Sequence, residues 1–145
     1  MSPLLRVVMD TSVLVSALRS RLGASFRLLE LVRDGRVQLV ASTALMLEYE
    51  SVITRPEHTV SLGCSPEQNL ADLSNLLLQV EPVEITARLR PALRDPDDDH
   101  VLEAAVSAGA FAIVTHNLRD FLPEASLYGM RVERPGAIIR LEAGL

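Results

Sequence analysis

The sequence predicts an α/β fold, in which helices cover both faces of a mainly parallel central sheet of about four to five strands in a three-layer α/β/α arrangement. Short apolar runs without polar alternation, such as residues 4–9, are typical of strands buried on both faces of a parallel sheet. These runs alternate with longer segments of helical periodicity, as in chains built from strand-helix-strand units. No linker or repeat interrupts the pattern, so residues 1–145 are expected to form one domain.

The first half of the chain alternates strand and helix signals. In order, they occupy residues 4–9 (strand), 11–20 (helix), 24–34 (helix), 36–42 (strand) and 43–55 (helix). Capping chemistry marks the helix boundaries, because Gly35 closes the second helix, Ser42 caps the third and Pro56 ends it. Each predicted strand is therefore expected to lead into a helix.

The second half continues the alternation after a less informative middle. In order, it contains residues 56–65 (loop), 66–78 (helix), 79–85 (weak strand or connector), 98–109 (helix), 111–117 (strand), 130–135 (strand) and 136–145 (helix). Pro66 suits the first turn of its helix, and Gly109 ends the helix that starts in an acidic run. The last strand-helix pair is expected to close the sheet.

Composition limits the classes of protein that fit. The 48% of hydrophobic residues exclude a disordered chain and suggest a covered apolar surface, for which a homodimer or a small protein partner is the simplest expectation. A net charge of −5 argues against a protein that binds duplex DNA mainly through electrostatic attraction to its phosphates. The single cysteine, Cys64, and the absence of a membrane-length apolar run indicate a cytoplasmic protein without membrane association.

Polar residues follow the strands at positions that the fold should bring together. Ligands bind beyond the carboxyl ends of strands in an open parallel sheet. Asp10 ends the first strand, Asn117 and Asp120 follow the strand at 111–117, and Asp99 begins the helix before it. Glu48, in the helix that starts after Ser42, is the natural fourth acidic member. We therefore expect these side chains to converge at one edge of the sheet.

Such a convergence has a chemical consequence. Carboxylates gathered without basic partners repel one another unless cations occupy the site. Oxygen ligands without a His or Cys cluster favour hard ions, here Mg²⁺ or Mn²⁺. Ions of this kind activate water and neutralise charge on a phosphodiester during in-line displacement. The residues thus predict phosphodiester hydrolysis.

The acidic run in residues 94–105 also has a structural interpretation. Aspartate is favoured at helix N-caps and in the first helical turn, where it meets unpaired N–H groups. Capping accounts for one or two members of the set Asp95, Asp97, Asp98 and Asp99.

Four stretches together resemble the PIN domain, and more narrowly the VapC-like ribonucleases that are the toxins of bacterial toxin-antitoxin systems. They are "VVMDTSVLVSAL", "ASTALMLEYESVITRP", "RDPDDDHVLEAAVSAGAFAIVTHNLRDF" and "RPGAIIRL". The first and third are the more specific, since the spacing from Asp99 to "VTHN" agrees with the family pattern. Residues 56–90 carry no diagnostic motif.

The resemblance implies a PIN-like fold with an acidic metal site that binds Mg²⁺ or Mn²⁺. Its family roles as catalytic residues and metal ligands fall on Asp10, Glu48, Asp99 and, at the fourth position, Asn117 or Asp120. The choice of Asp99 rather than Asp98 rests on register, and Asp97 or Asp98 could instead support the ligand indirectly. The set expected to support ion binding is Thr11, Ser12, Thr115 and Asn117. Many PIN domains have Asp where this chain has Asn117, and an amide contributes no charge, so Asp120 would have to compensate.

The function implied by the resemblance is metal-dependent cleavage of single-stranded RNA by a toxin that a cognate antitoxin holds inactive. Arginines near the rim, for example Arg19, Arg21 or Arg119, are candidates to steer the RNA backbone. The main alternative is a non-catalytic PIN-like binding or scaffold domain whose acids serve as caps. A phosphatase of the aspartyl-phosphate type fits less well, because Ser12 stands where a second Asp is needed and the chain has no lysine.

Overall fold

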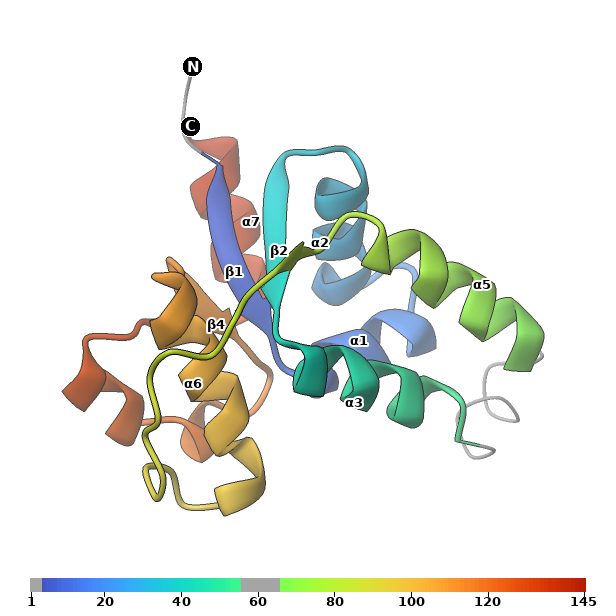
Figure 1. The fold of residues 1–145 in the computed structure, drawn as a ribbon. Coiled ribbons are helices and arrows are strands. Elements are labelled where there is room, and N and C mark those ends of the chain that lie inside the picture. The colour runs from blue at the N-terminus through green and yellow to red at the C-terminus, as the bar shows by residue number, and fades with distance from the viewer. Residues whose placement is uncertain (1–3, 56–65) are drawn as a thin grey trace.

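A five-stranded sheet with every neighbouring pair parallel forms the centre of the protein, so the predicted α/β fold class is confirmed. The computed structural model describes residues 4–55 and 66–145. The strand order is β3-β2-β1-β4-β5. The strands are β1 (Leu5–Met9), β2 (Val37–Ala41), β3 (Glu81–Pro82), β4 (Ala112–Val114) and β5 (Val132–Glu133). This order places β1, the first strand along the chain, in the middle of the sheet (Figure 1).

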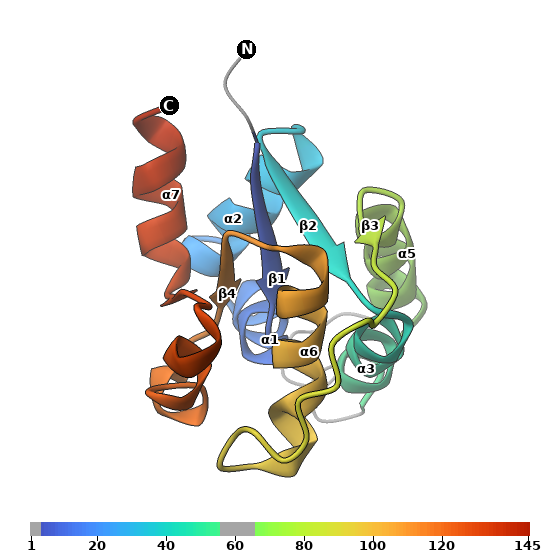
Figure 2. The same ribbon diagram turned by 60° about the vertical axis from the view of Figure 1, so that its left-hand side comes forward.

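Helices cover the sheet on both sides and complete the three layers. They are α1 (Thr11–Arg19), α2 (Ala24–Arg33), α3 (Thr43–Ile53), α5 (Pro66–Leu77), α6 (Asp99–Ala108) and α7 (Pro135–Ala143). Helix α6 packs on one face, while α1, α2 and α7 lie behind the other (Figure 2). Among the described residues, none of the helices combines the length and apolar character needed to cross a membrane.

The predicted elements agree with the observed ones apart from their ends and three short turns. The strand expected at 111–117 ends at Val114, because the chain turns where the Thr115 side chain and Asn117 N–H bond to each other. Short 3-10 turns that the sequence did not signal occupy Pro96–Asp98, Leu118–Asp120 and Glu124–Tyr128. The loop predicted at 56–65 lies outside the described residues.

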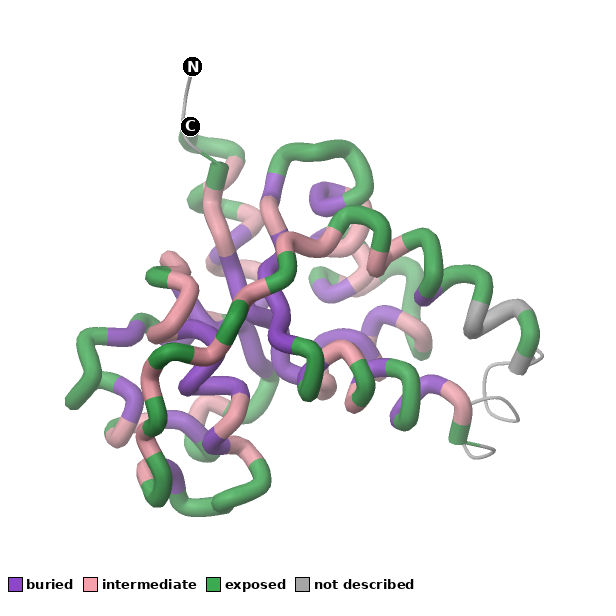
Figure 3. Tube along the Cα trace, viewed as in Figure 1, coloured by how far each residue is buried: buried purple, intermediate pink, exposed green. Residues whose placement is uncertain are grey.

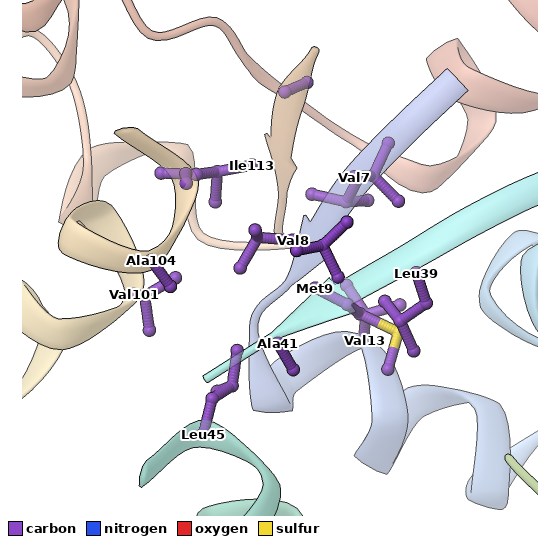
Figure 4. Close-up of a cluster of buried hydrophobic side chains, with 14 of the residues drawn as sticks. Val7, Val8, Met9, Val13, Leu39, Ala41, Leu45, Val101, Ala104 and Ile113 are labelled. Carbon is purple, nitrogen blue, oxygen red and sulfur yellow. The ribbon is translucent and has the colours of Figure 1, made fainter. Parts of the chain in front are cut away.

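The core forms where the central strands meet helices from both layers. Figure 3 shows the middle of the sheet buried and the outer turns exposed. Apolar side chains from six elements pack together here (Figure 4): Val7, Val8, Met9, Val13, Leu39, Ala41, Leu45, Val101, Ala104 and Ile113. Because the strands are apolar on both faces, the sheet is stable only with both helix layers in place.

A polar stripe on α6 fixes the long connector that leads from β3 back to this helix. Asp99, Glu103 and Ser107 stand four residues apart, which places them on one side of the helix. The connector donates backbone N–H groups to each: Leu93 to Asp99 (2.8 Å), Leu89 to Glu103 (2.9 Å), and Thr86 and Ala87 to Ser107 (both 3.0 Å). The connector thus satisfies its backbone without joining the sheet.

A buried tyrosine joins α3 to the end of β1. Tyr49 is fully buried, and its hydroxyl donates a hydrogen bond to the backbone carbonyl of Met9. Burial and the nearby carboxylates of Asp10 and Glu48 hold the pKa of Tyr49 well above its usual range, so the hydroxyl keeps its proton and remains a donor. The contact fixes the chain immediately before Asp10.

Removing this hydroxyl is predicted to destabilise the fold. Tyr49→Phe leaves the buried Met9 carbonyl without its side-chain donor, and we expect a loss of about 1–2 kcal/mol in the free energy of unfolding, measured by urea denaturation. Tyr128→Phe is the matched control, because Tyr128 is 41% exposed, and its expected change lies within about 0.5 kcal/mol. Equal losses in the two variants would contradict this role for Tyr49.

Candidate metal and phosphodiester site

The site is built around Asp10, at the end of the sheet where β1 and β4 both stop. The register pairs Met9 with Val114, so the residues that follow them, Asp10 and Thr115, lie side by side. The Asp10 N–H donates to the Val114 carbonyl at 2.9 Å, and the Thr115 hydroxyl donates to Asp10 Oδ2 at 2.9 Å. The parallel pairing of β1 and β4 therefore sets the position of the Asp10 carboxylate.

A second hydroxyl completes the support of Asp10. Ser12 Oγ donates to the same oxygen, Oδ2, at 2.8 Å, and accepts the His116 N–H at 3.2 Å. Asp10 occupies the N-cap position of α1, yet its side chain forms no capping hydrogen bond. Within the described part of the chain, Oδ1 of Asp10 receives no hydrogen bond. The carboxylate is thus positioned by hydroxyls and keeps one oxygen available to a ligand.

Asp10 lines a cavity of about 660 Å³ at this end of the sheet. Its polar lining groups fall into three sets. The acids are Asp10, Asp95, Asp98 and Asp120; the bases are Arg19, Arg55 and His116; the hydroxyl and amide residues are Thr11, Ser12, Ser16, Ser20 and Asn117. The cavity therefore brings together residues that the sequence placed in four separate segments.

The aspartates of the acidic run differ in their surroundings. Asp98 lines the cavity, whereas Asp99 is 1% exposed and accepts the N–H groups of Leu93 at 2.8 Å and Ala92 at 3.4 Å. The structure therefore does not bring Asp99, the ligand expected from register, to the cavity. Asp95, one of the acids for which the sequence allows a capping role, caps a 3-10 turn and also lines the cavity.

Negatively charged carboxylates surround Asp98. Burial, followed by the carboxylates of Asp10, Asp95, Asp120 and Glu48, raises the pKa of Asp98 from 3.8 to about 7. Each of the four neighbours disfavours a further negative charge at this position. A carboxyl in such surroundings gains stability from a bound cation.

Glu48 lies near the cavity but is engaged elsewhere. Its carboxylate binds His100 Nε2 at 2.6 Å, and this contact raises the pKa of His100, which favours the charged imidazolium. Glu48 does not line the cavity, although its charge acts on Asp98. The expected fourth acid is therefore close to the others but already paired with a base.

The segment after β4 places several predicted residues at the cavity. Asn117 and Asp120 both line it, and the Asn117 N–H donates to Thr115 Oγ1 at 3.0 Å. His116, which the sequence left as a weak signal, lines the cavity and hydrogen-bonds to the buried Ser25 of α2 at 2.6 Å. A serine near the start of a helix gave no sign of this contact, because it joins segments 91 residues apart.

The donor chemistry of the cavity fits a hard divalent cation, since the available ligands are carboxylate and amide oxygens. In residues 4–55 and 66–145, no three His, Cys, Asp or Glu side chains are close enough together to hold a metal ion. Binding therefore requires side chains such as Asp98 and Asp120 to move toward Asp10.

Comparison with known protein families identifies one match. Residues 6–119 match the family model described as PIN domain. The match runs from β1 to the turn after β4 and includes every residue that lines the cavity except Asp120. None of the curated proteins compared with the chain matches it.

Asp98 and Asp99 are predicted to respond oppositely to loss of their charge. The folded state retains the Asp98 proton up to about pH 7, so the metal-free protein should lose stability as pH rises from about 4 to 7. Asp98→Asn should remove this loss, with a gain of up to about 1 kcal/mol at pH 8 after allowance for solvent screening. Asp99→Asn should instead cost about 1–3 kcal/mol, because an amide N–H₂ would face the connector's donors.

Urea denaturation in EDTA at pH 5 and pH 8 measures both effects. Asp97→Asn is the control, because Asp97 is an exposed acid of the same run. A loss of stability in Asp98→Asn similar to that in Asp99→Asn would show that Asp98 is a structural cap.

Proposed function

The chain belongs to the PIN domain family, and from this premise we propose that it is a metal-dependent endoribonuclease that hydrolyses phosphodiester bonds in single-stranded RNA. PIN domains are in general nucleases, and therefore hydrolases that act on nucleic acid. Metal dependence and the choice of RNA are the more specific parts of the proposal. The observation that carries it is Asp98, a carboxyl whose pKa is raised by burial and by four neighbouring carboxylates at the edge of the sheet.

We assign the proposed ligands from the cavity lining. Asp10 and Asp98 would hold one or two Mg²⁺ or Mn²⁺ ions, with Asp120 and the Asn117 amide completing the set. When bound, such an ion supplies an activated water and neutralises charge on the phosphodiester. Asp98 replaces Asp99 in this assignment, because both oxygens of Asp99 accept backbone N–H groups.

The remaining residues of the site have supporting roles in this proposal. Ser12 and Thr115 orient Asp10 through its Oδ2, which leaves Oδ1 for the ion. Thr11 adds a hydroxyl at the same cavity. Glu48 stays in the proposed set because its charge acts on Asp98, and to act as a ligand it must share its carboxylate with His100.

We further propose, from the resemblance to VapC-like toxins, a single-domain cytoplasmic toxin that forms homodimers and is restrained by an antitoxin. Support for protein partners comes from large apolar side chains left exposed among the described residues. These include Leu22 (100%), Leu127 (83%), Leu78 (82%) and Leu47 (61%).

A non-catalytic PIN-like scaffold is the second candidate. It requires the acids to serve as helix caps, and the side-chain hydrogen bonds of Asp10 argue against that for the central residue. A scaffold would show neither stabilisation by Mn²⁺ nor cleavage. The two candidates therefore differ in a single assay.

The proposed nuclease should cleave single-stranded RNA in Mn²⁺ and lose this activity in EDTA. Asp10→Asn and Asp98→Asn should each lower kcat by about 100-fold or more, because each removes a charged ligand. Asp97→Asn, an exposed neighbour, should retain the wild-type rate. Gel analysis of a labelled RNA measures the cleavage. Full activity in both Asp10→Asn and Asp98→Asn would reject the site.

A further inference from the structure

The cavity has a basic end that the proposed chemistry does not use. Arg19, the last residue of α1, and Arg55, two residues beyond the end of α3, both line it. Arg6, Arg36 and Arg90 each form an ion pair with a glutamate. No carboxylate of the described residues pairs with Arg19 or Arg55. Two exposed arginines therefore line the cavity without a carboxylate partner among the described residues.

The basic end lies at a distance from the acidic end. Asp10 directly precedes α1 and Arg19 ends it, so at a rise of 1.5 Å per residue their Cα atoms are about 13 Å apart. This Cα separation leaves room for two neighbouring phosphates of one strand, one at each end of the cavity.

Helix α1 joins the two ends with a row of hydroxyls. Ser12, Ser16 and Ser20 recur every four residues, which places them along one side of the helix, and all three line the cavity. Hydroxyl groups and arginines are common donors to the phosphates and sugars of nucleic acids. The Ser12 hydroxyl already donates to Asp10, so Ser16 and Ser20 are the hydroxyls that remain to donate to a ligand between Asp10 and Arg19.

We propose that Arg19 and Arg55 form a subsite for an uncut phosphate of the RNA strand, at least one nucleotide away from the bond that is hydrolysed at Asp10. This inference rests on the proposed function, since it takes the acidic end as the point of cleavage. The guanidinium fork binds phosphate oxygens in a bidentate manner. Contact with a neighbouring phosphate sets the register of the strand, so the subsite contributes to RNA binding and not to the chemical step.

Two of the three arginines suggested by the sequence do not belong to this subsite. Arg21 lies over the ring of Phe26 at 5.9 Å from its centroid, and neither Arg21 nor Arg119 lines the cavity. Arg55 was not suggested, because it follows a helix far from any acidic motif. The arginines of the subsite are thus identified by their position in the cavity and not by their distance from the acidic residues in the sequence.

Binding of RNA tests the subsite independently of cleavage. In the Asp10→Asn background, designed to prevent cutting, fluorescence anisotropy would measure the Kd of a labelled single-stranded RNA decamer of mixed sequence. Arg19→Ala and Arg55→Ala should each raise Kd by roughly tenfold, as expected for loss of a charge-assisted contact. The slope of log Kd against log salt should fall by about 0.7 for each lost phosphate contact. Arg19→Lys should bind with intermediate affinity.

Two controls make the result specific. Arg140→Ala removes the same charge from the exposed surface of α7 and should leave Kd within about twofold of the parent. A dinucleotide carries one phosphodiester, which the proposal places at the acidic end, so in competition its affinity should fall less in the arginine variants than that of the decamer.

The outcomes separate the two proposals. A decamer Kd that is the same in Arg19→Ala, Arg55→Ala and Arg140→Ala overturns the subsite, even if wild type cleaves RNA. An equal loss for dinucleotide and decamer also overturns it, since the arginines would then act at the acidic end. Specific weakening of decamer binding, combined with no Mn²⁺-dependent cleavage by wild type, supports the subsite and rejects the nuclease proposal.

Discussion

The hydrogen bonds from Ser12 and Thr115 to one oxygen of Asp10 are the contacts on which the candidate site depends. They tie together the end of β1, the start of α1 and the end of β4, three elements that meet only because the central strands are parallel neighbours. A carboxylate held in this way has one oxygen fixed and the other free of protein donors among the described residues. The fold therefore orients the Asp10 carboxylate and leaves one of its oxygens available to a ligand.

The second constraint is charge. Four carboxylates act on Asp98 and raise its pKa, whereas the acids that stabilise the fold each have a local partner. Asp99 accepts connector N–H groups, and Glu103 accepts an N–H and binds Arg90 at 2.9 Å. Adjacent aspartates at the start of α6 thus serve opposite purposes. Asp99 stabilises the connector, while Asp98 adds to a repulsion that an ion would relieve.

Much of the fold was predictable because its strands and helices have strong local patterns, including the capping Ser42 and the helix-ending Gly35 and Gly109. The convergence of Asp10, Asn117 and Asp120 followed from parallel topology. The choice between Asp98 and Asp99 did not follow from the topology. Successive helical residues point in directions about 100° apart, and hydrogen bonds from the distant connector determine which of the two carboxylates is turned away from the cavity. The pairing of Glu48 with His100 and the place of Arg55 likewise depend on contacts between distant segments.

The most direct test of the account is a crystal structure of the protein with Mn²⁺, in which anomalous scattering locates the ion. The account predicts an ion bound between the carboxylates of Asp10 and Asp98, with Asp99 still hydrogen-bonded to the Leu93 N–H. An ion coordinated by Asp99, or crystals saturated with Mn²⁺ that show no ion at Asp10, would contradict it.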